Sequence, residues 1–148
     1  MLPVRARRWA IRSAYRVLRV YWYLRRPRMS GVKCVLTRED RVLLVRHTYG
    51  RDDWDLPGGA MKSGEEPAHA ARREICEELG VTIDNWRSLG VITGRADYRH
   101  DTLHCFQAPL GELQLTLDGT EIERAAWFER PALPPNLSRY VPRILALL

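Results

Sequence analysis

The stretch from Gly59 to Val81 constrains this chain most, because it joins a glycine-rich turn to a short helix. The preceding Pro57-Gly58-Gly59 is a turn signal, and Ser63-Gly64 is a second one. Pro67 suits the first helical position, where a missing N–H costs nothing, and Gly80 suits the position just after the helix. The stretch therefore predicts a turn that leads into a helix of about three turns.

This predicted helix separates an acidic side from an apolar side. Glu74, Glu77 and Glu78 are spaced i, i+3 and i+4, so their side chains should converge. Because three carboxylates repel one another, we expect a divalent cation among them. Oxygen ligands favour Mg²⁺ or Mn²⁺, and Mg²⁺ commonly binds with substrate phosphates. The alternative is a solvated acidic face that Arg72 and Arg73 screen. The opposite face can pack inward through Ala68, Ala71, Ile75 and Leu79.

The stretch resembles the signature of the Nudix hydrolases, G-x5-E-x7-R-E-U-x-E-E-x-G-U, in which U is aliphatic. Every specified position is filled, by Gly59, Glu65, Arg73, Glu74, Ile75, Glu77, Glu78, Gly80 and Val81. The resemblance extends from about Met29 to the C-terminus. It implies an α/β fold, the Nudix-type α/β/α sandwich with a mixed central sheet. It also implies a metal-dependent hydrolase that uses water to cleave a phosphoanhydride in a nucleoside diphosphate linked to another moiety.

The same resemblance assigns roles to single residues. Arg73 would orient Glu77 through an ion pair, and Glu65 would hold a metal-bound water. Relatives differ in their general base, so three candidates stay open, in the order Glu74, Glu78 and Glu121. Glu121 precedes the late Trp-Phe strand of the fold, with Glu123 as a substitute; the alternative is that both are surface charges. The implied metal ligands are Glu74, Glu77, Glu78 and the carbonyl of Gly58.

Alternating and apolar segments predict the strands of the sheet. Two of them form a hairpin around residues 38–40, and a polar loop over residues 94–101 separates the next pair. A C-terminal helix over residues 137–147 should begin at Asn136 as its N-cap, with Pro142 able to shorten it. The predicted strands are Gly31–Thr37, Arg41–His47, Trp86–Thr93, Thr102–Ala108, Gly111–Asp118 and Ala125–Phe128.

Five residues are candidates for substrate binding: Arg46, His47, Trp54, Arg95 and Tyr98. Arg46 and His47 close a strand near the expected site, although they equally suit a polar strand end. Trp54 can stack on a base, but sealing the core is the safer interpretation. Arg95 and Tyr98 lie in the polar loop, which is either a phosphate or nucleobase contact or a solvated turn. Tyr98 follows Val81 by 17 residues, as in similar hydrolases of diadenosine polyphosphates.

The positive charge of the chain is concentrated in its first 30 residues, which hold nine arginines and no acid. The remaining 118 residues hold 15 basic and 18 acidic side chains. Residues 1–28 thus form a basic amphipathic helical arm, which Pro27 ends, before a Nudix domain over residues 29–148. The helix spans about residues 4–26, and its apolar stripe is Val4, Ile11, Ala14, Tyr15, Leu18, Tyr21 and Trp22.

Three partners remain open for this arm. It can lie on an anionic membrane surface, bind RNA, or dock on its own domain or on the second subunit of a homodimer. An arginine-rich targeting peptide is a further option. The three cysteines lack metal-ligand spacing and indicate reduced thiols, so we expect a cytoplasmic, peripherally membrane-bound protein. The main alternative to a hydrolase is a non-catalytic nucleotide-binding domain that the arm recruits to membrane or RNA.

Overall fold

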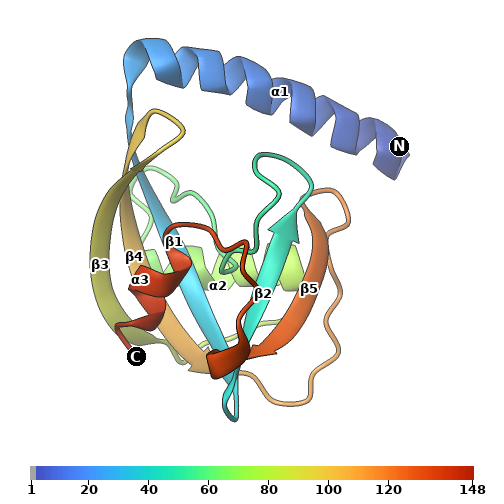
Figure 1. The fold of residues 1–148 in the computed structure, drawn as a ribbon, viewed down its shortest axis with the longest axis vertical. Coiled ribbons are helices and arrows are strands. Elements are labelled where there is room, and N and C mark those ends of the chain that lie inside the picture. Colours follow the sequence, from blue (N-terminus) through green and yellow to red (C-terminus); the bar gives the residue numbers. More distant parts are fainter. Residues whose placement is uncertain (1–2) are drawn as a thin grey trace.

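The structure is a computed structural model that describes residues 3–148. Its centre is a five-stranded sheet in the order β3-β4-β1-β2-β5 (Figure 1). β1 and β4 are parallel, with Gly31 opposite Leu103, whereas the other neighbours are antiparallel. The predicted mixed sheet is therefore confirmed. The strands are β1 (Arg28–Arg38), β2 (Arg41–His47), β3 (Arg87–Ala96), β4 (Arg99–Pro109) and β5 (Ile122–Glu129).

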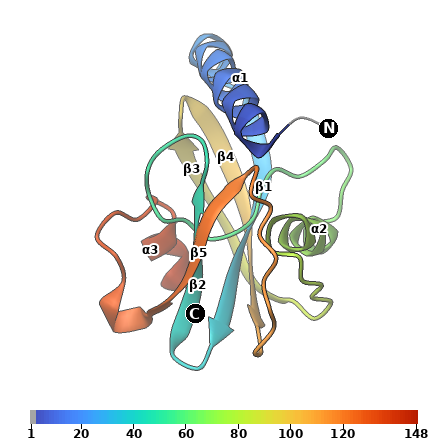
Figure 2. The same cartoon turned by 90° about the vertical axis from the view of Figure 1, so that its right-hand side faces the viewer.

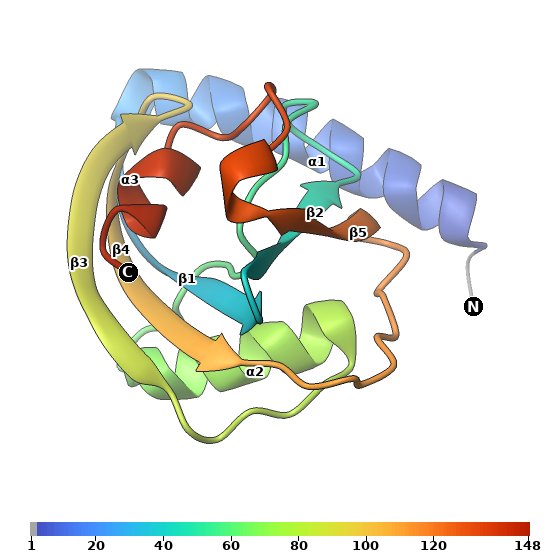
Figure 3. The ribbon, with the colours of Figure 1, turned by 60° about the horizontal axis from the view of Figure 1, so that its bottom comes forward.

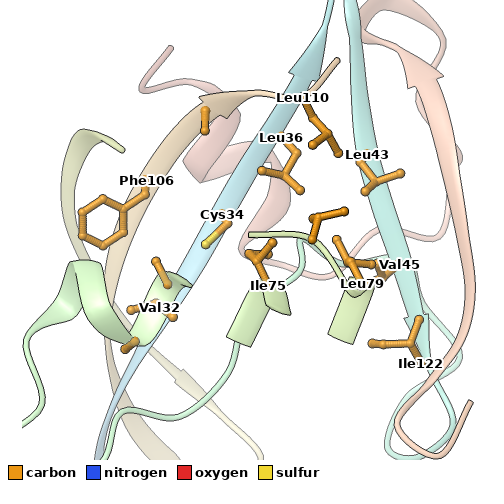
Figure 4. Packing of buried hydrophobic residues seen from close by; sticks show 14 residues of the cluster. Val32, Cys34, Leu36, Leu43, Val45, Ile75, Leu79, Phe106, Leu110 and Ile122 are labelled. Carbon is orange, nitrogen blue, oxygen red and sulfur yellow. The ribbon is translucent and has the colours of Figure 1, made fainter. Parts of the chain in front are cut away.

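One face of the sheet is covered by α2 (Pro67–Leu79), the helix that the glycine-rich stretch predicts. Pro67 stands in its first turn, and Gly80 adopts the left-handed conformation that ends it, at φ 70°. Ala71, Ile75 and Leu79 are buried against alternate residues of β1 and β2 (Figure 4). On the strands this layer is formed by Val32, Cys34, Leu36, Leu43 and Val45.

The opposite face is covered by the C-terminal segment, which contains η1 (Arg130–Ala132) and α3 (Val141–Leu145) (Figure 2). Val141 and Ile144 pack there with Val42 and Leu44 of β2. Consecutive residues of β2, Val42 to Val45, are all buried, so both faces of the strand are covered. This agrees with the continuous apolar run in its sequence. The two covered faces confirm the predicted α/β/α sandwich.

A third helix, α1 (Val4–Arg25), lies across one end of the sandwich (Figures 1 and 3). The loop after β2 and the β3–β4 hairpin project toward it. The stripe that the sequence marks as apolar faces the domain in part. Trp22 is buried, and Ile11, Tyr15 and Leu18 line a cavity beneath the helix, whereas Val4 and Tyr21 are exposed. Within residues 3–148, every helix is too short or too polar to cross a bilayer.

Three sequence predictions of local structure are wrong. The polar loop over residues 94–101 is mostly strand, because β3 and β4 continue to a tight turn in which Asp97 and Tyr98 have positive φ. Residues 111–118 alternate in polarity but have no strand partner, so they run as a loop. The C-terminal helix is shorter than predicted, since Pro142 sets its start; Asn136 does not cap it and instead donates a hydrogen bond to the Asp52 carbonyl at 3.1 Å.

Candidate functional site

Arg73 connects the glycine-rich turn to the acidic side of α2. Its Nε and Nη2 donate to the two carboxylate oxygens of Glu65 at 2.8 and 2.9 Å, a bidentate pair. Its Nη1 donates to Glu74 at 2.7 Å and to Glu77 at 3.3 Å, and Nη2 also reaches the Ala60 carbonyl at 3.0 Å. The hydrogen bonds from Arg73 lower the pKa of Glu65 to about 2. The predicted ion pair with Glu77 is present, but Arg73 holds Glu65 and Glu74 more closely.

Glu78 is the buried member of the acidic set. One of its carboxylate oxygens accepts a hydrogen bond from the Gly58 N–H at 2.9 Å, and its side chain is almost fully enclosed. Burial is the main cause that raises the pKa of Glu78, to about 8, and the charges of Glu74 and Glu121 add to it. A carboxylate held so far from water, with a single backbone donor, is costly unless a cation joins it.

Glu74 approaches the turn where only glycine leaves room. A Cβ on Gly59 would lie 2.6 Å from a carboxylate oxygen of Glu74, so the side chain occupies the space that a larger residue would need. Burial raises the pKa of Glu74, and the charges of Glu77 and Glu65 raise it further against the opposing effect of Arg73. Glu77 is more exposed, with 58% of its side chain accessible.

The predicted convergence of the three α2 carboxylates is incomplete in this arrangement. Glu74 turns to Arg73 and Glu78 turns to Gly58, and among residues 3–148 no group of three acidic, histidine or cysteine side chains is close enough to ligate an ion. Their electrostatics still fit a cation, because the charges of Glu74 and Glu121 raise the pKa of Glu78, and the charge of Glu74 raises the pKa of Glu121. The donor set is made of oxygen atoms alone, as hard divalent ions prefer.

A cavity of about 470 Å³ opens on the other side of the glycine-rich turn. Gly58, Gly59 and Glu121 line it from the domain, and residues of α1 line it from above. Burial raises the pKa of Glu121, and the nearby charges of Asp118 and Glu74 add to this shift. Of the three candidate general bases, Glu121 is thus the one that faces the cavity.

The basic side chains of this cavity are largely neutralised by acids. Lys33 donates to Asp55 at 2.7 Å, Arg99 lies 3.6 Å from Asp101, and Arg51 lies 3.9 Å from Asp97. Burial opposes the charge of Lys33, but the Asp55 carboxylate outweighs it and keeps the pKa of Lys33 above its ordinary value. Two of these pairs join residues that are distant in the chain, and the third lies on a part of β4 that precedes the predicted strand, so the sequence did not indicate them.

Only one of the five predicted substrate-binding residues, His47, lines the cavity. Arg46 instead forms an ion pair with Asp52 and lies over the ring of Trp54, at 5.7 Å from its centroid. Trp54 is buried against Phe128, as the core interpretation predicts. Arg95 uses its carbonyl to accept a hydrogen bond from Arg139, and Tyr98 packs edge-on against Tyr23 of α1. These four residues therefore support the walls and do not form the cavity surface.

Two tyrosines that were not predicted to bind substrate, Tyr15 and Tyr49, form one wall of the cavity together with His47. Tyr49 lies between His47 and Tyr15, with ring centroids 5.3 Å apart in both pairs. Tyr15 of α1 also donates to the Asp97 carboxylate in the β3–β4 turn. The contact crosses 82 positions of sequence, so no local pattern could have indicated it.

Comparison with solved structures identifies the same fold elsewhere. A MutT Nudix hydrolase from Burkholderia pseudomallei superposes with a TM-score of 0.74 and 25% identity, over 82% of this chain and 98% of that one. A UDP-X diphosphatase superposes with a TM-score of 0.67 and 28% identity, over 80% of this chain and 60% of that one.

Sequence similarity to characterised proteins is more local. Human diphosphoinositol polyphosphate phosphohydrolase 3-beta is 48% identical over 65 residues, which are 44% of this chain and 40% of that protein. Diphosphoinositol polyphosphate phosphohydrolase 2 from Mus musculus is 45% identical over 65 residues, which are 36% of that protein. The matched region thus spans less than half of these relatives.

A model of the whole domain extends the match. The NUDIX domain model covers residues 27–148, from the start of β1 to the last residue and including all five strands and α2. Enzymes of this kind generally use divalent metal ions, in agreement with the acidic side of α2. The chain therefore belongs to the Nudix hydrolase family.

Proposed function

We propose that this Nudix hydrolase cleaves the phosphoanhydride bond of a nucleoside diphosphate linked to another moiety and releases two phosphate-bearing products. The observation that carries the proposal is the complete signature within the matched domain, where Glu74 and Glu121 interact electrostatically with Glu78 and Glu121 lines a cavity. The similarity to a UDP-X diphosphatase supports the same reaction class.

The residues that would hold Mg²⁺, or Mn²⁺ in its place, are Glu74, Glu77, Glu78 and the carbonyl of Gly58. The chemistry that a bound divalent cation supplies is neutralisation of phosphate charge and activation of a water nucleophile. Glu65 would act behind this set, since its bidentate pair fixes Arg73, and Arg73 in turn fixes Glu74. This chain of contacts restricts the rotamers of the proposed ligands.

Glu121 is our choice of general base among the three candidates. Glu78 is committed to the Gly58 N–H and Glu74 to Arg73, whereas Glu121 faces the cavity. Its raised pKa makes it a stronger proton acceptor near neutral pH. A carboxylate oxygen of Glu121 would take the proton of the attacking water. The new bond from the water oxygen to phosphorus replaces the bond to the bridging oxygen, which leaves with the second phosphate.

The cavity favours a planar, uncharged group next to the diphosphate. It is lined by five acidic and four basic side chains, and three of the basic ones already face an acid. A ring that carries many phosphates would require a surplus of cations. A nucleobase would instead use the aromatic wall of Tyr15, His47 and Tyr49. We therefore expect nucleotide-type substrates rather than inositol polyphosphates.

The test is a hydrolysis assay with UDP-sugars, dinucleoside polyphosphates and a diphosphoinositol polyphosphate, each with Mg²⁺ and with Mn²⁺. Glu77→Gln and Glu78→Gln should each lose more than about nine-tenths of the metal-dependent rate, since such electrostatic contributions are worth several kcal/mol. Glu112→Gln, at an exposed position in the loop after β4, is the matched control and should retain the rate. Nucleotide binding without turnover of any substrate would contradict the proposal and indicate the non-catalytic alternative.

A further inference from the structure

The helix α1 has a second apolar face that the domain does not cover. Trp9, Val17, Val20 and Leu24 form an outer stripe, with exposed fractions of 73%, 70%, 61% and 72%. At 100° per residue these four side chains fall within about a quarter turn of one another, opposite Tyr15 and Trp22. Exposed apolar side chains of this size, gathered on one helix, mark an interaction surface.

The outer stripe is fixed in its outward orientation by contacts on the inner side of α1. Arg8 and Arg12 donate to the carbonyls of Gly119 and Thr48, both at 2.6 Å, and Tyr15 donates to Asp97. Rotation of the helix to bury the stripe would break these contacts. In Figures 1 and 2 no other element of residues 3–148 lies on the outer side of α1.

Arginines border this stripe on both sides. Arg5 and Arg16 adjoin the stripe on one side, and Arg7 and Arg25 lie about 80° beyond its edge on the other side. Within the part of the chain that the structure describes, none of the four forms an ion pair with a carboxylate. We propose that the outer stripe and its arginines bind the surface of an anionic lipid bilayer, with α1 lying parallel to the membrane.

The apolar and basic parts of this surface match the two parts of a lipid surface. Val17, Val20 and Leu24 would enter the boundary between headgroups and acyl chains, where Trp9 is also well accommodated. The flexible arginine side chains would reach the phosphates above them. A second copy of the chain fits less well, because two facing helices would bring their flanking arginines together. An RNA site would leave the apolar stripe unused.

The test is flotation of the full-length protein with vesicles of phosphatidylcholine alone or with about 30% phosphatidylserine. The wild-type chain should float with the anionic vesicles only, and less so in high salt. Val17→Gln/Leu24→Gln should lower the apparent partition coefficient at least tenfold. Val91→Gln/Leu113→Gln makes the same changes of residue type at two other exposed positions, and it should stay within twofold of the wild type.

Three outcomes would overturn the proposal. The first is equal or absent flotation of the wild type with both kinds of vesicle. The second is a mass of two chains in lipid-free solution that Val17→Gln/Leu24→Gln converts to one, which would assign the stripe to a homodimer. The third is salt-sensitive RNA binding, with no flotation, that Arg5→Gln/Arg16→Gln abolishes and Val17→Gln/Leu24→Gln retains. A circular dichroism melt of each variant checks that α1 and the domain remain folded.

Discussion

Gly58 holds the glycine-rich turn against the sheet through its lack of a side chain. Its φ is 136°, and a Cβ there would lie 2.2 Å from the Val32 carbonyl oxygen of β1. Gly64 in the same turn region also has a positive φ, 73°, but nothing lies within 4 Å of its added Cβ. An alanine at Gly64 would therefore meet backbone strain alone, whereas an alanine at Gly58 would meet both backbone strain and a steric clash.

We predict that Gly58→Ala destabilises the fold by more than about 3 kcal/mol, because backbone strain and a clash with main chain add. Gly64→Ala should cost only about 1 kcal/mol, the cost of a left-handed alanine. Urea unfolding of both variants measures the difference. Equal losses in the two variants would show that the sheet gives way to the added methyl group.

His47 makes the stability of the domain depend on pH. Burial, together with the charge of Lys33, lowers its pKa from 6.5 to about 4, and its Nδ1 lacks a partner within the described residues. Between these two values the unfolded chain takes up a proton that the folded chain does not. The contribution of the neutral His47 to the free energy of unfolding is therefore fully present above pH 6.5, and it declines as the pH falls toward 4.

His47→Gln should remove this dependence. The free energy of unfolding of the wild type, relative to the variant, should fall on acidification by at most about 3 kcal/mol, the value for a shift of this size. Chemical denaturation at several pH values, with both proteins in the same buffers, measures this difference. A difference that is constant over this range would place His47 in contact with water.

At the residue scale the sequence predicts what is local. Arg73, Glu65 and the glycines act within one turn and one helix, so their spacing in the chain determines their arrangement. The cavity residues differ: Lys33 and Asp55 are 22 positions apart, and Tyr15 and Asp97 are 82 apart. Their proximity depends on strand order and helix docking, which residue spacing does not encode.

At the scale of elements, prediction succeeded where burial dictates the pattern. β2 was predicted with its observed bounds, because both of its faces are covered and its central residues, Val42 to Val45, are apolar and buried. The end of the β3–β4 hairpin, residues 94–101, was predicted as a loop because the two strands extend toward α1 (Figure 1), where polar residues such as Arg95 and Arg99 are tolerated in strands. α1 was ambiguous for another reason, since it has apolar residues on two faces.

The two faces of α1 can be compared through its two tryptophans. Trp22 is 6% exposed, packs edge-on against Tyr15 and lies under the guanidinium of Arg99 at 4.2 Å, whereas Trp9 is exposed to solvent. We predict that Trp22→Ala loosens the docked helix, because truncation of a buried tryptophan costs about 3–5 kcal/mol. Trp9→Ala should change stability by less than about 0.5 kcal/mol.

Amide hydrogen exchange measures this prediction directly. In Trp22→Ala the protection of α1 amides should fall at least about tenfold, with that of α2 unchanged, because local opening of a docked element has its own free energy. Similar exchange in both tryptophan variants would show that the polar contacts of Arg8, Arg12 and Tyr15 suffice to hold the helix.

At the scale of the molecule, α1 adds to a domain that is complete in its core. The family match begins at residue 27, and both buried apolar clusters lie between Val32 and Ile144. We therefore predict that residues 27–148 fold cooperatively on their own.

The proposed metal ligands and Glu121 all belong to that part, so kcat on a nucleotide substrate should stay within a few-fold of the full chain. α1 supplies one wall of the cavity, so its removal should raise KM about tenfold, equivalent to about 1.4 kcal/mol of binding energy.

Steady-state kinetics of the full chain and of residues 27–148 separate these effects. A rise in KM at constant kcat identifies α1 as a binding wall, since uniform binding energy is lost without a change in the chemical step. A lower KM in the shortened chain would mean that α1 obstructs the cavity instead. A loss of kcat together with cooperative unfolding would mean that α1 orders Gly58 and Glu121, through its hold on the neighbouring Thr48 and Gly119 carbonyls.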